Sequence, residues 1–249
     1  MKIDIDSMLD DLNGTVTDFE KAFTEFPIPP VSVVEARANV VFNLCAEKRV
    51  VHLGCADLLS VIDDRLKSGV YLHTQLSFVA SECIGIDINR DAIAHLHKRG
   101  VTNVIEADIT KPGITEIENS RWDWLAMPEV LEHVPNPVQF LQAVNETYGN
   151  YIERILITTP NAFGSFVQPV EWFAREVTYF DHFYYFTPYT LCKIVHSAGF
   201  ELEELIMCSH EHVQLDKESV ECFKRYPLLM GNILLTARSR SYTKNEKCY

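Results

Sequence analysis

The sequence is short of basic residues and of long apolar runs. Its 249 residues include 22 Lys and Arg against 35 Asp and Glu, which gives a net charge of −13 at pH 7. Nucleic acids and anionic membranes bind basic faces, so this balance argues against both partners. No run reaches the roughly 18 apolar residues of a membrane span, and no membrane segment is predicted.

Cysteine pairs and secretory features are also missing. The seven cysteines form no C-x-x-C pair, and no positively charged, then apolar, segment opens the chain. Scattered thiols of this kind are typical of a reducing compartment, so we expect a cytoplasmic protein. The chain has no internal repeat. With 47% hydrophobic residues, it is long enough to form one domain with a sizeable core.

The stretch at 50–57, Val-Val-His-Leu-Gly-Cys-Ala-Asp, predicts a short buried strand that ends on Gly54. Glycine lets the backbone approach a ligand closely, and open α/β sheets bind ligands at the carboxyl ends of their strands. A single glycine would equally fit an ordinary turn. The stretches that follow strengthen the first interpretation.

Acidic residues follow two further predicted strands. The strand at 82–89 ends on Asp87, where a carboxylate is placed to accept hydrogen bonds from both hydroxyls of a ribose. The stretch at 104–109 predicts a third strand with Asp108 just past its end. More strands are predicted at 122–129, 155–159, 201–207 and 232–237, with helical patterns at 32–47, 57–66, 70–80, 90–99, 137–148 and 188–198. This alternation predicts a mostly parallel sheet with helices on both faces.

The sequence resembles the class I S-adenosylmethionine-dependent methyltransferases in five motifs that follow that family's order: HLGCAD, IGIDIN, EADIT, WDWLAMPEVLEHV and ILITTPN. The resemblance covers residues 48–238 and is strongest to the branch with an E-V-L-E-H turn after the fourth strand. It implies an α/β fold with a seven-stranded, mostly parallel sheet whose final strand is antiparallel. Residues 1–47 would then form an N-terminal helical extension, and 239–249 a flexible tail.

The resemblance implies S-adenosylmethionine as the cofactor, and the order of the motifs assigns its adenosine half to four residues. Asp87 takes the ribose hydroxyls, and Asp108 accepts a hydrogen bond from the adenine amino group. Ile88 and Ile109 flank the adenine ring.

The methionine half of the cofactor is assigned to the turns after the first and fourth strands. The backbone of Gly54, Cys55 and Ala56 passes under the methionine portion. Met127 and Pro128 face the cofactor near the methyl donor.

His52 and Ala56 depart from the family pattern. The family usually has Asp or Glu at the position of His52, near the amino group of the cofactor, and a second glycine at the position of Ala56. We count His52 among the cofactor-binding residues and expect binding to survive both changes. The departure leaves open a non-catalytic protein that binds the cofactor without turnover.

The turn at 129–133 brings together Glu129, Glu132 and His133, because residues three and four apart share one side of a helical turn. Small-RNA 3′-end 2′-O-methyltransferases carry such a turn and use it, with a later histidine, for a metal; His182 is the candidate here. Hydrogen bonds that order the loop, a base or substrate-orienting role, and a divalent metal site all stay open. We predict no metal ligand, because the acidic charge disfavours RNA.

An aromatic insertion at 161–187 follows the fifth predicted strand. Aromatic walls with a few polar tips are typical of small-molecule sites, although some of these rings will pack on the sheet. We predict a small apolar or aromatic acceptor, with His133 or His182 as the catalytic group that takes its proton. The aromatic residues are Phe163, Phe166, Trp172, Phe173, Tyr179, Phe180, Phe183, Tyr184, Tyr185 and Phe186.

The sequence therefore predicts a methyltransferase that modifies oxygen or nitrogen on a small molecule. The alternatives are a non-catalytic cofactor-binding protein and a metal-dependent RNA 2′-O-methyltransferase. A nicotinamide-dependent oxidoreductase would need G-x-G-x-x-G, and residues 54–59 read Gly-Cys-Ala-Asp-Leu-Leu instead. The sequence does not indicate an oligomeric state.

Overall fold

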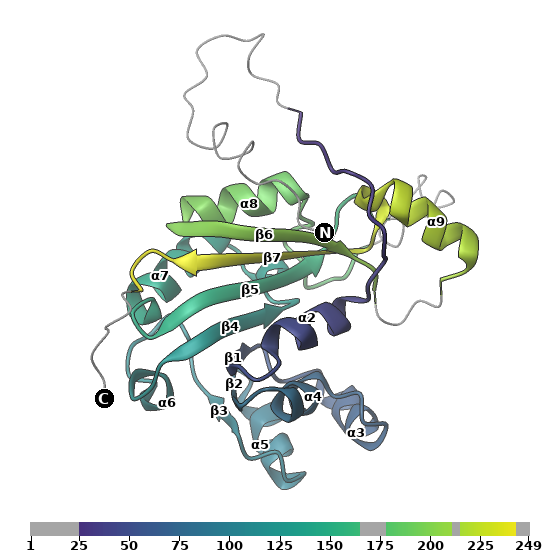
Figure 1. The fold of residues 1–249 in the computed structure, drawn as a ribbon. Helices are drawn as coiled ribbons and strands as arrows, with labels where there is room; N and C mark the ends of the chain where they lie inside the picture. Colours follow the sequence, from purple (N-terminus) through teal and green to yellow (C-terminus); the bar gives the residue numbers. More distant parts are fainter. Residues whose placement is uncertain (1–24, 165–177, 211–214, 243–249) are drawn as a thin grey trace.

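The computed structural model describes residues 25–164, 178–210 and 215–242, whose strands form one sheet in the order β3-β2-β1-β4-β5-β7-β6 (Figure 1). Strands β1 to β5 pair in parallel, whereas β7 is antiparallel to both of its neighbours. The predicted seven-stranded sheet with an antiparallel final strand is confirmed. The strands are β1 Arg49–Leu53, β2 Glu82–Asp87, β3 Val104–Glu106, β4 Trp122–Pro128, β5 Ile152–Pro160, β6 Phe200–Cys208 and β7 Asn232–Ser239.

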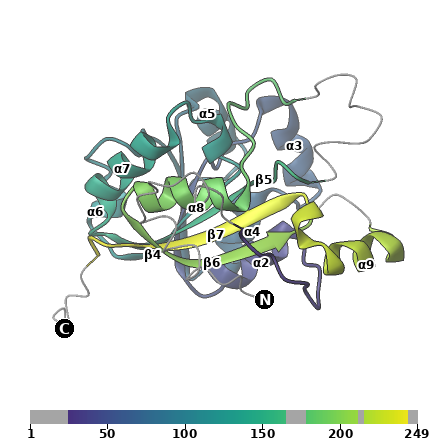
Figure 2. The same ribbon diagram turned by 90° about the horizontal axis from the view of Figure 1, so that it is seen from above.

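Helices cover both faces of the sheet (Figure 2). Successive side chains of a strand point to opposite faces, so Val51 packs in a core cluster with α7 and α8, while Val50 packs with α2 and α4. Burial on both faces explains why the central residues of these parallel strands are mostly apolar. The helices are α2 Arg37–Cys45, α3 Leu59–Lys67, α4 Leu72–Val79, α5 Arg90–Lys98, α6 Thr115–Glu118, α7 Pro137–Tyr148, α8 Pro188–Ser197 and α9 Lys217–Arg225, with 3-10 turns η2 Leu131–His133 and η4 Pro227–Leu229.

Three predicted helix starts are confirmed by their caps. The Asn89 side chain accepts a hydrogen bond from the backbone N–H of Ala92 at the start of α5. Asn136 caps α7, whose first residue is Pro137, and Thr187 caps α8. Each cap satisfies a backbone N–H that has no partner within its own helix.

The predicted helix at 32–47 is shorter in the structure, because α2 begins at Arg37. Ala36 instead forms a parallel bridge with Ser209, which follows β6. The Ser209 N–H donates to the Glu35 carbonyl and the Arg37 N–H to the Ser209 carbonyl, both at 2.9 Å. These bonds to the end of β6 hold the segment extended and replace the first helical turn.

Other boundaries also differ from the predictions. The helices α6 and α9 were not predicted, and β7 continues to Ser239, one residue into the predicted tail. Residues 1–24 of the predicted extension and 243–249 of the predicted tail lie outside the described residues. None of the helices that the structure describes is long and apolar enough to cross a membrane.

Candidate active site

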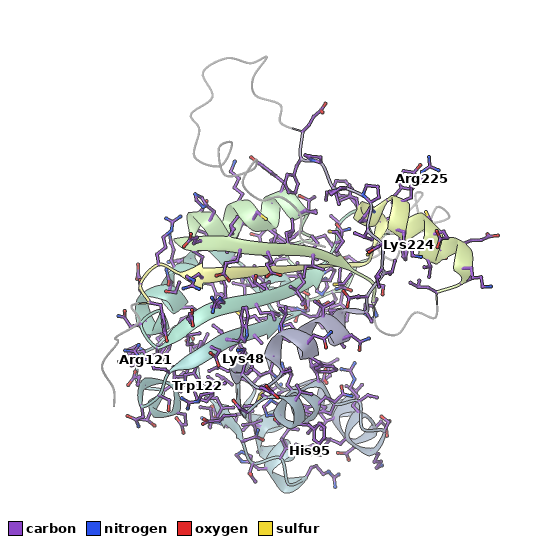
Figure 3. The ribbon with its side chains drawn as sticks, viewed as in Figure 1. Lys48, His95, Arg121, Trp122, Lys224 and Arg225 are labelled. Carbon is purple, nitrogen blue, oxygen red and sulfur yellow. The ribbon has the colours of Figure 1, made fainter. Side chains whose placement is uncertain are left out.

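The candidate site lies where the parallel strands end. Arg121 and Trp122 mark the amino end of β4 (Figure 3), so the functional turns lie at the opposite, carboxyl, end of that strand. Strands β1 and β4 are neighbours in the sheet, but β2 continues to one side of the pair and β5 to the other. Open α/β sheets bind ligands at such a switch point.

Gly54 forms the tight turn after β1. Its φ is +71°, a conformation that side chains rarely adopt, and its N–H donates to the Ile86 carbonyl at 2.9 Å. A Cβ atom at this position would lie 2.6 Å from Cγ2 of Val130. Glycine is therefore required by both conformation and space, and the turns after β1 and β4 lie against each other.

The Asp87 carboxylate joins the turns after β1 and β2. One oxygen accepts from the Ala56 N–H at 3.0 Å and the other from the Asn89 N–H at 2.9 Å. A carboxylate has about four acceptor positions, so two remain for ribose hydroxyls. The neighbouring Ile88 is 76% exposed and offers an apolar surface of the kind that an adenine ring covers.

Asp108 is exposed beside this surface. Its Oδ1 accepts from the Thr110 hydroxyl at 2.6 Å and from the Thr110 N–H at 2.9 Å, and these bonds hold the pKa of Asp108 below its usual value. Thr110 uses only one of the two oxygens. The arrangement is compatible with the predicted hydrogen bond to an adenine amino group.

Ile109, Met127 and Pro128 were predicted to border the cofactor, and their side chains are not exposed in the structure. All three are buried, and Ile109 and Met127 belong to the main hydrophobic core. Met127 points to the same face as Leu125, because side chains two apart in a strand share a face. Their contact with a cofactor stays a prediction.

His52 is also buried, and it pairs with His73 of α4. Their Nδ1 atoms are 3.1 Å apart and their rings are stacked. Burial, then His73 and Arg37, hold the pKa of His52 well below its ordinary value, and burial lowers the pKa of His73 to about 4. The ring of His52 thus packs against α4, and its role beside the amino group of the cofactor stays a prediction.

Sequence patterns gave no indication of Tyr71, which holds the same turn. Its hydroxyl donates to the Cys55 carbonyl at 2.7 Å and accepts from the Asp57 N–H at 3.4 Å. Cys55 itself is buried, and this burial raises the pKa of its thiol. The hydroxyl of Tyr71 therefore holds the backbone of the turn after β1 at two residues, Cys55 and Asp57.

Glu129 is the first residue after the carboxyl end of β4 and has a φ of +55°. Its Oε1 accepts from the Thr158 hydroxyl at 2.9 Å and from the Asn232 amide at 3.1 Å. The guanidinium of Arg37 lies 3.1 Å from the same oxygen. Glu129 is thus held by three donors, none of which the sequence analysis identified.

Glu132 is fully buried. Its Oε2 accepts from the Thr159 hydroxyl at 3.1 Å, while its Oε1 has no hydrogen-bond partner among the described residues. Burial, and then the nearby Glu129 carboxylate, raise the pKa of Glu132 to about 8. Burial and the neighbouring Glu129 thus both disfavour the charged form of this carboxyl group.

His133 and His182 come together, as predicted for a shared site. Their ring centroids are 4.7 Å apart, and Nδ1 of His133 lies 3.1 Å from the Asp181 carboxylate. The Phe183 N–H donates to the Glu132 carbonyl at 2.8 Å, which fastens the insertion to the turn after β4. Ligand atoms of Glu132, His133 and His182 all lie within 4.8 Å of one another, so these three could hold a metal ion.

The described part of the aromatic insertion is mostly exposed next to these histidines. Phe180 is 86% exposed and Phe183 58%, and the rings of Tyr179 and Tyr185 contact His182. Phe186 is buried in the core, as expected for some of the rings. The predicted residues Phe166, Trp172 and Phe173 lie outside the described residues.

A cavity of about 410 Å³ lies elsewhere, against α2 and α4. No titratable side chain lines it, so it lacks the groups that methyl transfer or cofactor recognition requires. Its lining residues are Phe42, Gly69, Thr74, Gln75, Phe78 and Val79.

The sheet order, the Gly54 turn after β1 and the Asp87 carboxylate at the end of β2 define the class of the protein. It is a doubly wound protein that binds a nucleoside cofactor at the ends of β1 and β2. A family model described as a methyltransferase domain matches residues 41–205. The chain belongs to this family, and it is a class I S-adenosylmethionine-dependent methyltransferase.

Solved structures share the fold at low identity. Magnesium protoporphyrin IX methyltransferase from Synechocystis PCC 6803 is 15% identical, with a TM-score of 0.51 over 81% of each chain. A putative methyltransferase solved with the Trm112 activator of Haloferax volcanii is 13% identical, with a TM-score of 0.53 over 81% of this chain and 88% of that one.

The small RNA methyltransferase HEN1 is 15% identical, with a TM-score of 0.54, and the match covers 93% of this chain but 28% of that one. A search of curated proteins found none that matches this sequence. Identities this low show the fold alone, so the acceptor has to be argued from the site.

Proposed function

We propose that the protein transfers the methyl group of S-adenosylmethionine to oxygen or nitrogen of a small, mostly apolar or aromatic acceptor. The observation that supports this most is the His133–His182 pair between the turn after β4 and the exposed aromatic side chains. Such a surface suits an apolar molecule with one polar reacting group.

The sulfonium group makes its methyl carbon electrophilic without help from the protein. The acceptor oxygen or nitrogen forms the new bond to that carbon as the sulfur–carbon bond breaks, and the acceptor proton passes to an imidazole. Burial, then His133, hold the pKa of His182 below its ordinary value, so its ring is neutral and able to take a proton at pH 7. The protein otherwise contributes proximity and orientation.

Asp87→Ala should weaken the binding of S-adenosylmethionine and of its demethylated product by at least about tenfold, because a hydrogen bond to a charged acceptor contributes about 1.5–3 kcal/mol. Titration calorimetry measures this effect. Asp91→Ala, on the exposed face of α5, is the control and should bind like the wild type. Unchanged affinity in Asp87→Ala would show that the ribose does not bind here.

The acceptor can be found by incubating the protein with metabolite extracts and S-adenosylmethionine and searching by mass spectrometry for the gain of one methyl group. A product with an apolar or aromatic skeleton supports the proposal. Tight cofactor binding with no product from any extract would favour the non-catalytic alternative instead.

A second candidate is a metal-dependent RNA 2′-O-methyltransferase. It is favoured by the Glu132, His133 and His182 cluster and by the likeness in fold to the small RNA methyltransferase HEN1. The net charge of −13 counts against an RNA substrate, and the contacts of Glu129 count against a four-ligand metal site.

Methyl transfer to the small acceptor should therefore continue unchanged in EDTA, because Glu129 is already neutralised by Arg37 and the imidazole supplies the base. The measurement compares initial rates before and after dialysis against the chelator. Loss of activity that magnesium or manganese restores would contradict this prediction. Glu129, Glu132, His133 and His182 would then be the ligands to substitute.

A further inference from the structure

Two of the residues that contact the Glu129 carboxylate lie outside the part of the chain that matches the family model. The family model covers residues 41–205, whereas Arg37 lies before it and Asn232 after it. Both side chains reach Glu129, at 3.1 Å each, and both residues are buried. The segments on either side of the family stretch therefore meet at one carboxylate in the site.

The charges around Glu129 favour a cation. The Glu129 carboxylate lies close enough to Glu132 to disfavour a second negative charge there, and the imidazoles of His133 and His182 lie beside Glu132. Two carboxylates and two imidazoles are a donor set that divalent transition metals bind. Here a guanidinium already lies against Glu129, and arginine keeps its charge in any protein environment.

The backbone at Glu129 adds a second reason for a fixed partner. A φ of +55° is uncommon for a residue with a side chain, and such conformations persist when surrounding contacts hold them. Arg37 also lies 3.3 Å from the Thr158 hydroxyl, which donates to Glu129. One guanidinium thus contacts two members of the network that orients the turn before Glu132.

We propose that Arg37 is the built-in cation of the acceptor site: a positioning residue that neutralises Glu129, fixes the turn after β4 and keeps a divalent cation away from the two glutamates. A metal ion that bound Glu129 would lie beside the guanidinium, and the two like charges would repel. This inference refines the proposed function, since it explains how an acidic donor set can serve metal-free methyl transfer.

The test measures manganese binding, which requires no acceptor. Chelator-treated wild type, Arg37→Met, Arg37→Lys and the double variant Arg37→Met/Glu129→Gln are titrated with MnCl₂ alone in a calorimeter. Methionine replaces the apolar stem of the side chain and removes its charge, and lysine keeps the charge. Glutamine removes the carboxylate that a released metal site would use.

Arg37→Met should bind Mn²⁺ roughly tenfold or more tightly than the wild type, because a full positive charge beside the carboxylates has gone. Arg37→Lys should stay near the wild type, and the double variant should lose the gain. A purely structural role for Arg37 would not raise the affinity for a metal. Equal Mn²⁺ affinity in wild type and Arg37→Met would overturn the proposal.

Stability provides a second measurement if Arg37→Met folds poorly. Removal of one partner leaves the half-buried Glu129 carboxylate without its cation, whereas removal of both charges does not. The double variant should therefore melt at a higher temperature than Arg37→Met, and a lower or equal temperature would overturn the proposal. Calorimetry with S-adenosylmethionine tests the proposed function separately, because the manganese comparison stands whether or not the wild type binds the cofactor.

Discussion

Replacing both buried histidines, His52→Leu and His73→Leu, should remove most of the loss of stability that the wild type suffers between pH 6.5 and pH 4. A histidine whose pKa is lowered by folding stabilises the native state above its unfolded pKa of 6.5, and this contribution is lost as the pH falls through the folded pKa. For His73 the pKa falls to about 4, which corresponds to about 3 kcal/mol. His52 adds a contribution of the same sign.

Glu132 acts in the opposite direction. Its raised pKa, about 8, means that it stabilises the native state below pH 4.5 and that this contribution is lost as the pH rises through 8. The histidine effect is therefore best measured in a Glu132→Gln background, where the carboxyl group no longer titrates. Without this background the two contributions partly cancel in the wild-type curve.

The measurement is the free energy of unfolding by urea at a series of pH values from 4 to 8. At pH 7.5 the leucine pair should be close to the wild type or more stable, because Nε2 of both histidines is buried without a hydrogen-bond partner among the described residues. His97→Leu, at an exposed position on α5, is the control and should keep the pH dependence. An equally steep curve in the double variant would refute a buried neutral pair.

His182→Ala should lower the turnover number by about 10²-fold and leave the affinity for S-adenosylmethionine within about threefold, because it removes the proton acceptor and not a cofactor contact. Its lowered pKa adds a pH prediction. A base acts when deprotonated, so the wild-type rate should fall as the pH drops below 6.5 and should be level above pH 7.

The control is His97→Ala, which changes an exposed histidine in the last turn of α5. Loss of cofactor binding together with turnover in His182→Ala would mean that the part of the insertion around His182 is structural. Full turnover in His182→Ala, with loss in His133→Ala, would assign the proton transfer to His133. Thermal melting of each variant separates either result from unfolding.

The positions of the turns after β1 and β2 were predictable because their determinants are local in the sequence. Gly54 and Asp87 each end a buried strand, and parallel strands bring such ends to one edge of the sheet. The same rule gives the positions of Met127 and Ile109 but not their orientation. The alternation of faces had to be followed along each strand to see that these side chains enter the core.

The acceptor half was only partly predictable. His133 and His182 could be proposed as a pair because both stand out among aromatic and acidic neighbours. Arg37 and Asn232 carry no such signal, since each is an ordinary residue at the start of an element, and only the folded chain brings them to Glu129. The pairing of His52 with His73 likewise depends on how α4 packs on β1.

The position of β7 has a consequence for how the chain folds during synthesis. This strand lies between β5 and β6 in the sheet, yet it is the last of the three in the sequence. Until the ribosome has released residues 232–239, the edges of β5 and β6 that face each other have no strand between them. Open strand edges pair readily with other chains, so the risk of aggregation is greatest before this strand has joined the sheet. Asn232 arrives with the same strand, and the acceptor site is therefore among the last parts of the molecule to form.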